Sequence, residues 1–155
     1  ALALCEDFAD GEPVVVMLGD NILEDDVAPA MQAFQRQGTG AKIFLKAVEN
    51  PRSFGVAEIA GDRVVNIEEK PTKPKTNYAV IGLYCYDAQV WEVVKTLQPS
   101  ARGELEITDV NNHYVRQGSM TFEILRGWWG DGGESFDSLL LAANLVAQRV
   151  RRAHA

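Results

Sequence analysis

The apolar run Val14-Val15-Val16-Met17, followed directly by Leu18-Gly19-Asp20-Asn21, constrains the fold of this chain more than any other feature. An uninterrupted apolar run of this kind predicts a buried parallel strand over residues 14–18. Asp20 then stands where the strand opens into a loop, and ligands of α/β sheets bind at such strand ends. Beside a glycine that permits close approach, its carboxylate is suited to holding Mg²⁺. An ordinary turn explains the same four residues.

Length and composition favour a single domain over residues 1–155, because 155 residues that are 46% hydrophobic suffice for one core and are too few for two. The net charge is −7, and no stretch interleaves Lys or Arg with aromatic residues, so we expect no nucleic-acid partner. We find neither a signal peptide nor an apolar run of the about 18 residues that a membrane span needs. We therefore expect a cytoplasmic protein without membrane contact.

Cysteine and histidine are scarce. Cys5 and Cys85 lack the spacing of metal ligands, and we expect both to be reduced and buried. His113 and His154 are the only histidines, so the sequence offers few residues from which a His-rich zinc site or a Ser-His-Asp triad could form.

Strands and helices alternate along the chain. Strands are predicted over residues 14–18, 41–48, 54–60, 63–67, 78–86 and 120–125, and Gly61-Asp62 is typical of a hairpin turn. Residues 70–75 contain two prolines and predict a loop. One helix is expected to end at Gly38, a second to begin after Asp87, and a third to span residues 105–117. The expected architecture is a mixed, mainly parallel sheet flanked by helices.

A last helix is predicted from the apolar stripe that it carries on one face, which we expect to pack on the core. The stripe consists of Phe136, Leu139, Leu140, Ala143, Ala147 and Val150.

Five motifs occur in the order and spacing of the sugar-phosphate nucleotidyltransferases, and the chain resembles that family from about Pro13 to Val146. They are Leu18-Gly19-Asp20-Asn21, Glu68-Glu69-Lys70-Pro71, residues 77–84 (Asn-Tyr-Ala-Val-Ile-Gly-Leu-Tyr), residues 101–109 (Ala-Arg-Gly-Glu-Leu-Glu-Ile-Thr-Asp) and Trp129-Gly130-Asp131-Gly132-Gly133. Within the family they match the glucose-1-phosphate thymidylyltransferases. The resemblance implies a Rossmann-related nucleotide-diphospho-sugar transferase fold.

The resemblance also implies roles for individual residues. Asp20 and Asp131 would jointly hold Mg²⁺ between nucleotide and sugar phosphates. Glu69 would accept hydrogen bonds from sugar hydroxyls, and Lys70 would meet a phosphate. Without the other motifs, a solvated Glu-Glu-Lys run on a strand edge would explain that pair.

Further residues correspond to the sugar side of the family's pocket. Gly55 would let backbone groups face the sugar ring, although a strand kink explains it too. Val80 and Gly82 belong to the strand that floors the pocket. Glu104 would lie on the sugar side with Arg102 orienting it, and capping of the following helix explains both nearly as well.

Two departures from the family pattern stand out. The family motif Trp-x-Asp-Thr-Gly-Thr corresponds to Trp129-Gly130-Asp131-Gly132-Gly133-Glu134 in this chain. Glycine and glutamate replace the two threonines, so two hydroxyls near the metal position are absent and an acid is added. The family's Gly-rich, Arg-containing phosphate loop and its catalytic Lys, which belong to the segment that also reads the nucleobase, have no counterpart in this chain. We expect a chain that begins within the fold: a fragment, one half of a split enzyme, or a partial gene with another use.

The implied parent reaction joins an NTP and glucose 1-phosphate into an NDP-sugar, dTDP-glucose by resemblance, with release of pyrophosphate. We expect this chain alone to be inactive, because phosphoryl-type transfer depends on positioning the triphosphate. One alternative is a non-catalytic module that binds sugar 1-phosphate or nucleotide sugar, or that oligomerises. Another is a metal-dependent glycosyltransferase, but Gly19-Asp20-Asn21 lacks the Asp-x-Asp pair that such enzymes usually have. By resemblance, the absent segment would supply strands that flank residues 14–17, so this strand would become an unpaired edge, which predicts a homo-oligomer.

Overall fold

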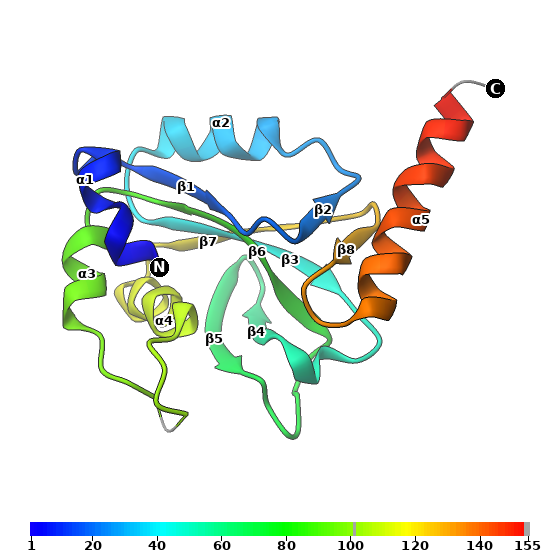
Figure 1. Cartoon of the computed structure of the whole chain (residues 1–155). Helices are drawn as coiled ribbons and strands as arrows, with labels where there is room; N and C mark the ends of the chain where they lie inside the picture. The colour runs from blue at the N-terminus through cyan, green and yellow to red at the C-terminus, as the bar shows by residue number, and fades with distance from the viewer. Residues whose placement is uncertain (101, 154–155) are drawn as a thin grey trace.

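Strand β6 (Tyr78–Tyr86) is the centre of the sheet in the computed structural model, which describes residues 1–100 and 102–153 (Figure 1). It pairs antiparallel with β1 (Val14–Met17), β3 (Ala41–Ala47) and β4 (Gly55–Ala60). The strand runs over the predicted residues. Its side chains alternate between the two faces of the sheet, which is why a nearly continuous apolar sequence is needed when both faces are covered.

The other elements surround this strand. They are η1 (Leu2–Cys5), α1 (Glu6–Ala9), β2 (Asn21–Leu23), α2 (Ala28–Gln37), η2 (Pro51–Ser53), β5 (Arg63–Glu69), α3 (Val90–Thr96), α4 (Ile107–Gln117), β7 (Met120–Ile124), β8 (Trp129–Asp131) and α5 (Phe136–Ala153).

The sheet separates two apolar cores. On one face, Ile81, Leu83 and Cys85 of β6 pack with Phe34 of α2. On the other, Tyr84 and Tyr86 belong to the larger core that α3 and α4 cover. Figure 1 shows α2 on one side of the sheet and α3 and α4 on the other. The prediction of a sheet flanked by helices is confirmed.

The sheet is mixed, with the strand order β5-β4-β6-β3-β7 and β1 beside β6. Within the described residues only β3 and β7 pair in parallel, so the expected excess of parallel pairing is not found. Tight connections favour antiparallel neighbours, as at the β4–β5 hairpin, where Gly61 takes a φ of 64°.

The prediction for residues 14–18 was wrong in two respects. Strand β1 runs antiparallel to β6, and its side chains alternate between half-buried and exposed. Val15 and Met17 are about half exposed, at 48% and 52%. An apolar run indicates that a strand forms, but it contains no information on the direction of the neighbouring strand.

A separate two-stranded ribbon pairs β2 with β8 in antiparallel orientation, and Asn21 lies opposite Asp131. The ribbon unites residues more than one hundred positions apart in the chain. It therefore brings the motif around Asp20 next to the motif around Asp131.

Helix α5 forms as predicted, but its expected buried face is wrong. None of the six residues in the predicted stripe is buried: Leu139 is 51% exposed and Phe136 is 93% exposed. The helix packs instead through the small Ala142, which lies against Gly130 of β8, and Arg149 donates to the Glu24 carbonyl at 2.7 Å. In Figure 1 it stands at one end of the sheet.

The two cysteines differ from each other. Cys85 is buried as expected, whereas Cys5 is exposed at the end of η1, so that prediction was wrong. Ala101, the first residue of the motif at residues 101–109, lies outside the described residues, as do His154 and Ala155 at the end of the predicted domain. None of the helices in the described part of the chain is long and apolar enough to cross a membrane.

Candidate functional site

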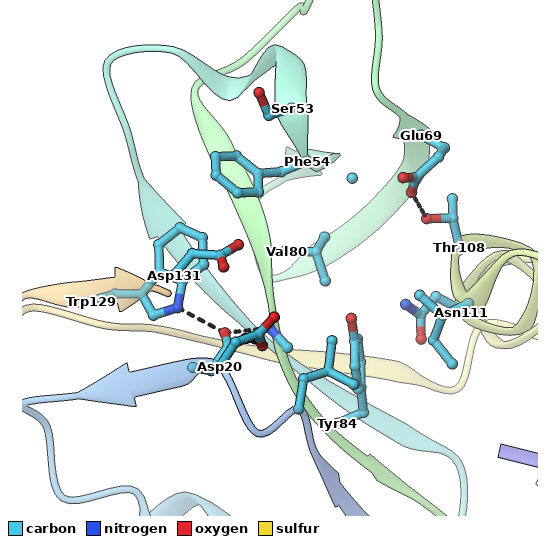
Figure 2. Close-up of a pocket in the computed structure, with 15 residues that line it drawn as sticks. Asp20, Ser53, Phe54, Glu69, Val80, Tyr84, Thr108, Asn111, Trp129 and Asp131 are labelled. Carbon is cyan, nitrogen blue, oxygen red and sulfur yellow. Dashed lines mark hydrogen bonds between the residues drawn. The ribbon is translucent and has the colours of Figure 1, made fainter. Parts of the chain in front are cut away.

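A cavity of about 180 Å³ opens where β6, the β2–β8 ribbon, the β4–β5 hairpin and the first turn of α4 meet (Figure 2). Six residues that the sequence predicts for the site line this cavity. They are Asp20, Gly55, Glu69, Val80, Gly82 and Asp131. The chain places them on five different segments, so the cavity exists only in the folded protein.

One end of the cavity carries the two predicted metal ligands. Asp20 precedes β2 and Asp131 ends β8, and the Gly132 amide donates to the Asp20 carbonyl at 2.8 Å. Figure 2 shows both carboxylates beside the cavity. Gly133 is required for this approach, because a Cβ there would lie only 2.1 Å from Asp20 Oδ2.

These carboxylates suit a hard cation. Asp20 Oδ1 accepts from the Asn21 amide and Asp131 Oδ1 accepts from Gly133 N–H, which leaves the second oxygen of each carboxylate available. The residues that line the cavity include three acids and no base. No group of three or more His, Cys, Asp and Glu side chains in the described residues is arranged around a metal position. A pair of carboxylates nevertheless fits Mg²⁺, which takes one or two and completes its shell with phosphates and water.

Asn21 fixes this end of the cavity. Its Oδ1 accepts from Gly82 N–H at 2.9 Å and from the Trp129 indole N–H at 2.8 Å, and its Nδ2 donates to Asp20 Oδ1 at 2.8 Å. One buried amide therefore joins β6, β8 and the Asp20 carboxylate. Gly82 makes room for it, because a Cβ there would lie 2.6 Å from Asn21 Nδ2.

The opposite end of the cavity is built around Glu69, the last residue of β5. The Thr108 hydroxyl of α4 donates to Glu69 Oε2 at 2.5 Å. Gly55 lies opposite Glu69 in the hairpin, and a Cβ on it would approach Thr108 Oγ1 at 3.2 Å and Glu69 Oε2 at 3.3 Å. Gly55 thus leaves space in front of a carboxylate that can accept further hydrogen bonds.

Aromatic side chains and a buried amide complete the lining. Phe54 and Trp129 meet edge to face with 5.1 Å between ring centroids. Tyr84 and Asn111 line the side next to α4. Burial raises the pKa of Tyr84, and the charges of Glu69 and Asp20 raise it further, so its phenol stays neutral at physiological pH.

Lys70 is not among the residues that line the cavity. It follows Glu69, its side chain is exposed, and its φ of 43° lies in the left-handed region that non-glycine residues rarely adopt. The sequence predicts a backbone turn at Pro71 that lets Glu69 and Lys70 reach one ligand. The turn begins one residue earlier, at Lys70 itself.

Arg102 and Glu104 lie at the rim, outside the lining residues. Arg102 pairs with Glu104 at 3.0 Å and approaches Glu69 at 3.6 Å and Glu106 at 3.7 Å. Arg102 therefore lies next to the carboxylate expected to meet the sugar, whereas Glu104 is paired to Arg102 and exposed. Neither side chain caps α4, whose N-cap residue is Glu106.

The sequence interpretation assigned no role to Thr108, Asn111 or Trp129. Tyr84 belongs to the buried core and also lines the cavity. Thr108 and Asn111 are three residues apart on α4 and therefore share a face. That spacing, directly after the Arg-Gly-Glu motif, was the available signal for the pair.

Comparison with known proteins agrees with the motifs. The nucleotidyl transferase family model matches residues 1–149. A glucose-1-phosphate thymidylyltransferase from Actinoplanes sp. is 46% identical over 143 residues, which cover 90% of this chain and 47% of the relative. Another, from Neisseria meningitidis serogroup A, is 42% identical over 160 residues, covering 99% of this chain and 55% of the relative.

Solved structures agree as well. A Bacillus anthracis protein assigned as a glucose-1-phosphate thymidylyltransferase, solved in complex with sucrose, is 49% identical with a TM-score of 0.86, covering 93% of this chain and 58% of that one. A UDP-glucose pyrophosphorylase with UDP-glucose shares the fold at 22% identity and a TM-score of 0.82, covering 96% and 61%. The chain spans about half the length of the curated relatives it matches. The family resemblance is thus confirmed, and the chain belongs to the nucleotidyl transferase family.

Proposed function

We propose that the cavity binds a hexose 1-phosphate, or the same part of a nucleotide sugar, together with one Mg²⁺ held by Asp20 and Asp131. The observation that carries this proposal is the division of one cavity into two polar ends, a carboxylate pair at one and the Glu69–Thr108 pair at the other. A hexose 1-phosphate is divided in the same way, into a charged phosphate and neutral hydroxyls. The carboxylate pair would repel the phosphate unless a cation lay between them.

At the sugar end, the chain's own groups recognise hydroxyls. Glu69 accepts their hydrogen bonds, with one oxygen already oriented by Thr108. Val80 and Gly82 form the floor, and the missing side chain of Gly55 gives the ring access to Glu69. Lys70 is exposed beside this carboxylate, outside the cavity lining and away from the carboxylate pair, so the binding proposal rests on Glu69 and not on Lys70.

The proposed reaction of the full-length protein is NTP plus glucose 1-phosphate giving an NDP-sugar, dTDP-glucose, and pyrophosphate. A phosphate oxygen of the sugar attacks the α-phosphorus of the nucleotide, and pyrophosphate leaves, so the protein needs no nucleophile of its own. For these 155 residues alone we propose binding without turnover, because their sequence contains no Gly-rich, Arg-containing loop to position the triphosphate.

Calorimetry with glucose 1-phosphate and Mg²⁺ tests the binding proposal, beside a pyrophosphate-release assay on the same sample. Glu69→Gln should weaken binding about tenfold or more, since a hydrogen bond to a charged group contributes roughly 1.5–3 kcal/mol. Glu68→Gln is the matched control, because it makes the same change on the preceding residue, which is exposed and does not line the cavity. Equal affinities for the two variants would refute the role of Glu69. Release of pyrophosphate would refute the proposal of binding without turnover.

The metal is tested with Mn²⁺, whose electron paramagnetic resonance signal decreases on binding. Asp131→Asn should abolish most of this binding, and Asp137→Asn, on the exposed first turn of α5, should leave it unchanged. Unaltered Mn²⁺ binding by the Asp131 variant would remove the metal assignment.

A further inference from the structure

Asn111 has a polar group that the protein does not use. Its side chain is fully buried, at 0% exposure, on α4. Its Oδ1 accepts a hydrogen bond from the Tyr86 hydroxyl at 2.7 Å, but its Nδ2 has no hydrogen-bond partner. A buried N–H without a partner is rare and costly, because water no longer solvates it. The partner of this N–H must therefore come from the cavity, as a water molecule or as a group of a ligand that replaces it.

The position of Asn111 shows where that partner must lie. Asn111 lines the cavity, and Figure 2 shows its amide nitrogen directed towards the cavity beside Tyr84. It is one turn along α4 from Thr108, whose hydroxyl binds Glu69. Glu69 thus offers an acceptor and Asn111 a donor at the same end of the cavity.

The surroundings favour a neutral oxygen. The Glu69 carboxylate faces this end of the cavity and no basic residue lines it, although Arg102 approaches Glu69 from the rim at 3.6 Å, so a neutral oxygen fits beside Asn111 better than an anion. A hydroxyl group both donates and accepts, and it is the one common group that satisfies a carboxylate and an amide N–H side by side.

We propose that Asn111 is a specificity-determining residue whose Nδ2 donates a hydrogen bond to a hydroxyl oxygen of the bound sugar. The inference rests on the proposed function, because it takes the ligand of the cavity to be a hexose 1-phosphate. It adds a donor to the acceptor Glu69, and together they select for a hydroxyl at one ring position.

The test compares glucose 1-phosphate with its monodeoxy analogues by calorimetry. Asn111→Asp removes the donor and keeps an acceptor for Tyr86, and Asn111→Ala removes both. Each variant should bind glucose 1-phosphate about tenfold more weakly and should no longer distinguish it from one of the analogues. Asn144→Asp is the matched control: the same change on an exposed helical residue of α5 that does not line the cavity. It should retain the discrimination.

A measurement on the unaltered chain avoids any folding defect of the variants. On addition of glucose 1-phosphate, the side-chain amide signals of Asn111 should shift in the NMR spectrum, and their protons should exchange more slowly. If the wild-type chain binds the sugar phosphate while these signals stay fixed, or while every deoxy analogue loses the same affinity in the wild type and both variants, the role of Asn111 is overturned. Absence of any binding to the wild type overturns the proposed function instead, and the inference with it.

Discussion

Strand β6 and helix α5 are both rich in apolar residues, but they differ in how much of their side-chain surface is buried. Eight of the nine residues of β6 are buried, whereas α5 exposes most of its large side chains to solvent. The strand has partners on both sides and both faces within this chain. The helix contacts mainly the short ribbon strand β8, through its small residues.

This difference shows that an apolar sequence pattern predicts an apolar face but does not identify the element that packs against it. For β6 the cover consists of α2 on one face and α3 with α4 on the other. For α5, the described residues bury only a small part of the apolar side chains. The candidate site belongs to the buried part of the molecule, because β6 forms the floor of its cavity and α4 forms its wall.

The largest expected effect comes from the same substitution made in the two elements. Leu83→Ala in β6 should reduce the free energy of unfolding by about 2–5 kcal/mol, because it opens a cavity in a fully buried core. Leu140→Ala in α5, where the side chain is 62% exposed, should change it by less than about 0.5 kcal/mol. Urea denaturation of both variants measures the contrast. Comparable losses would mean that α5 is covered in solution.

A smaller effect is expected where β6 meets the ribbon. Gly82→Ala should destabilise the protein by about 1–3 kcal/mol, because the new Cβ would press on Asn21 and on Leu18 Cβ at 2.9 Å. Displacing Asn21 should also disturb Asp20. Gly19→Ala is the control, since nothing lies within 4 Å of its Cβ position. Equal denaturation midpoints for the two variants would contradict this reasoning.

The sequence predicted much of this fold because most of its signals are local. The Gly61-Asp62 turn, the ends of β6 and the end of α2 at Gly38 all depend on residues within a few positions. The direction of β1 and the packing of α5 depend on distant partners, and the sequence interpretation of both was wrong. Helical periodicity cannot tell a face that packs from a face that stays exposed.

The site was predictable to the extent that motifs identified it. Asp20, Glu69 and Asp131 do line one cavity, but the motifs did not distinguish them from Lys70 and Glu104, which lie outside the lining. Asn111 was missed because the sequence signalled it only through its spacing from Thr108. Its unpaired amide group became known only from the folded chain.

The next prediction concerns self-association, which is expected from the exposed edge of β1. Val15→Lys should reduce any oligomer to a monomer, because a charged side chain on an edge opposes pairing with a second copy. Val65→Lys makes the same change on β5, another strand at the end of the sheet, and should leave the oligomer intact. Light scattering at micromolar concentration decides between them. A monomeric wild-type chain would refute the expectation altogether.

The smallest effect leaves stability unchanged at neutral pH and appears in chemical reactivity. Burial raises the pKa of Cys85 on β6 to about 11, whereas Cys5 is exposed on η1. At pH 8 a thiol reagent should therefore label Cys5 quickly and Cys85 only after unfolding.

Above pH 9 the unfolded chain loses the Cys85 proton that the folded chain retains, so the free energy of unfolding should fall as the pH rises towards 11. Cys85→Ser should remove the slow labelling phase and flatten that decline. Rapid labelling of both cysteines at pH 8 would mean that β6 opens far more readily than its complete burial indicates.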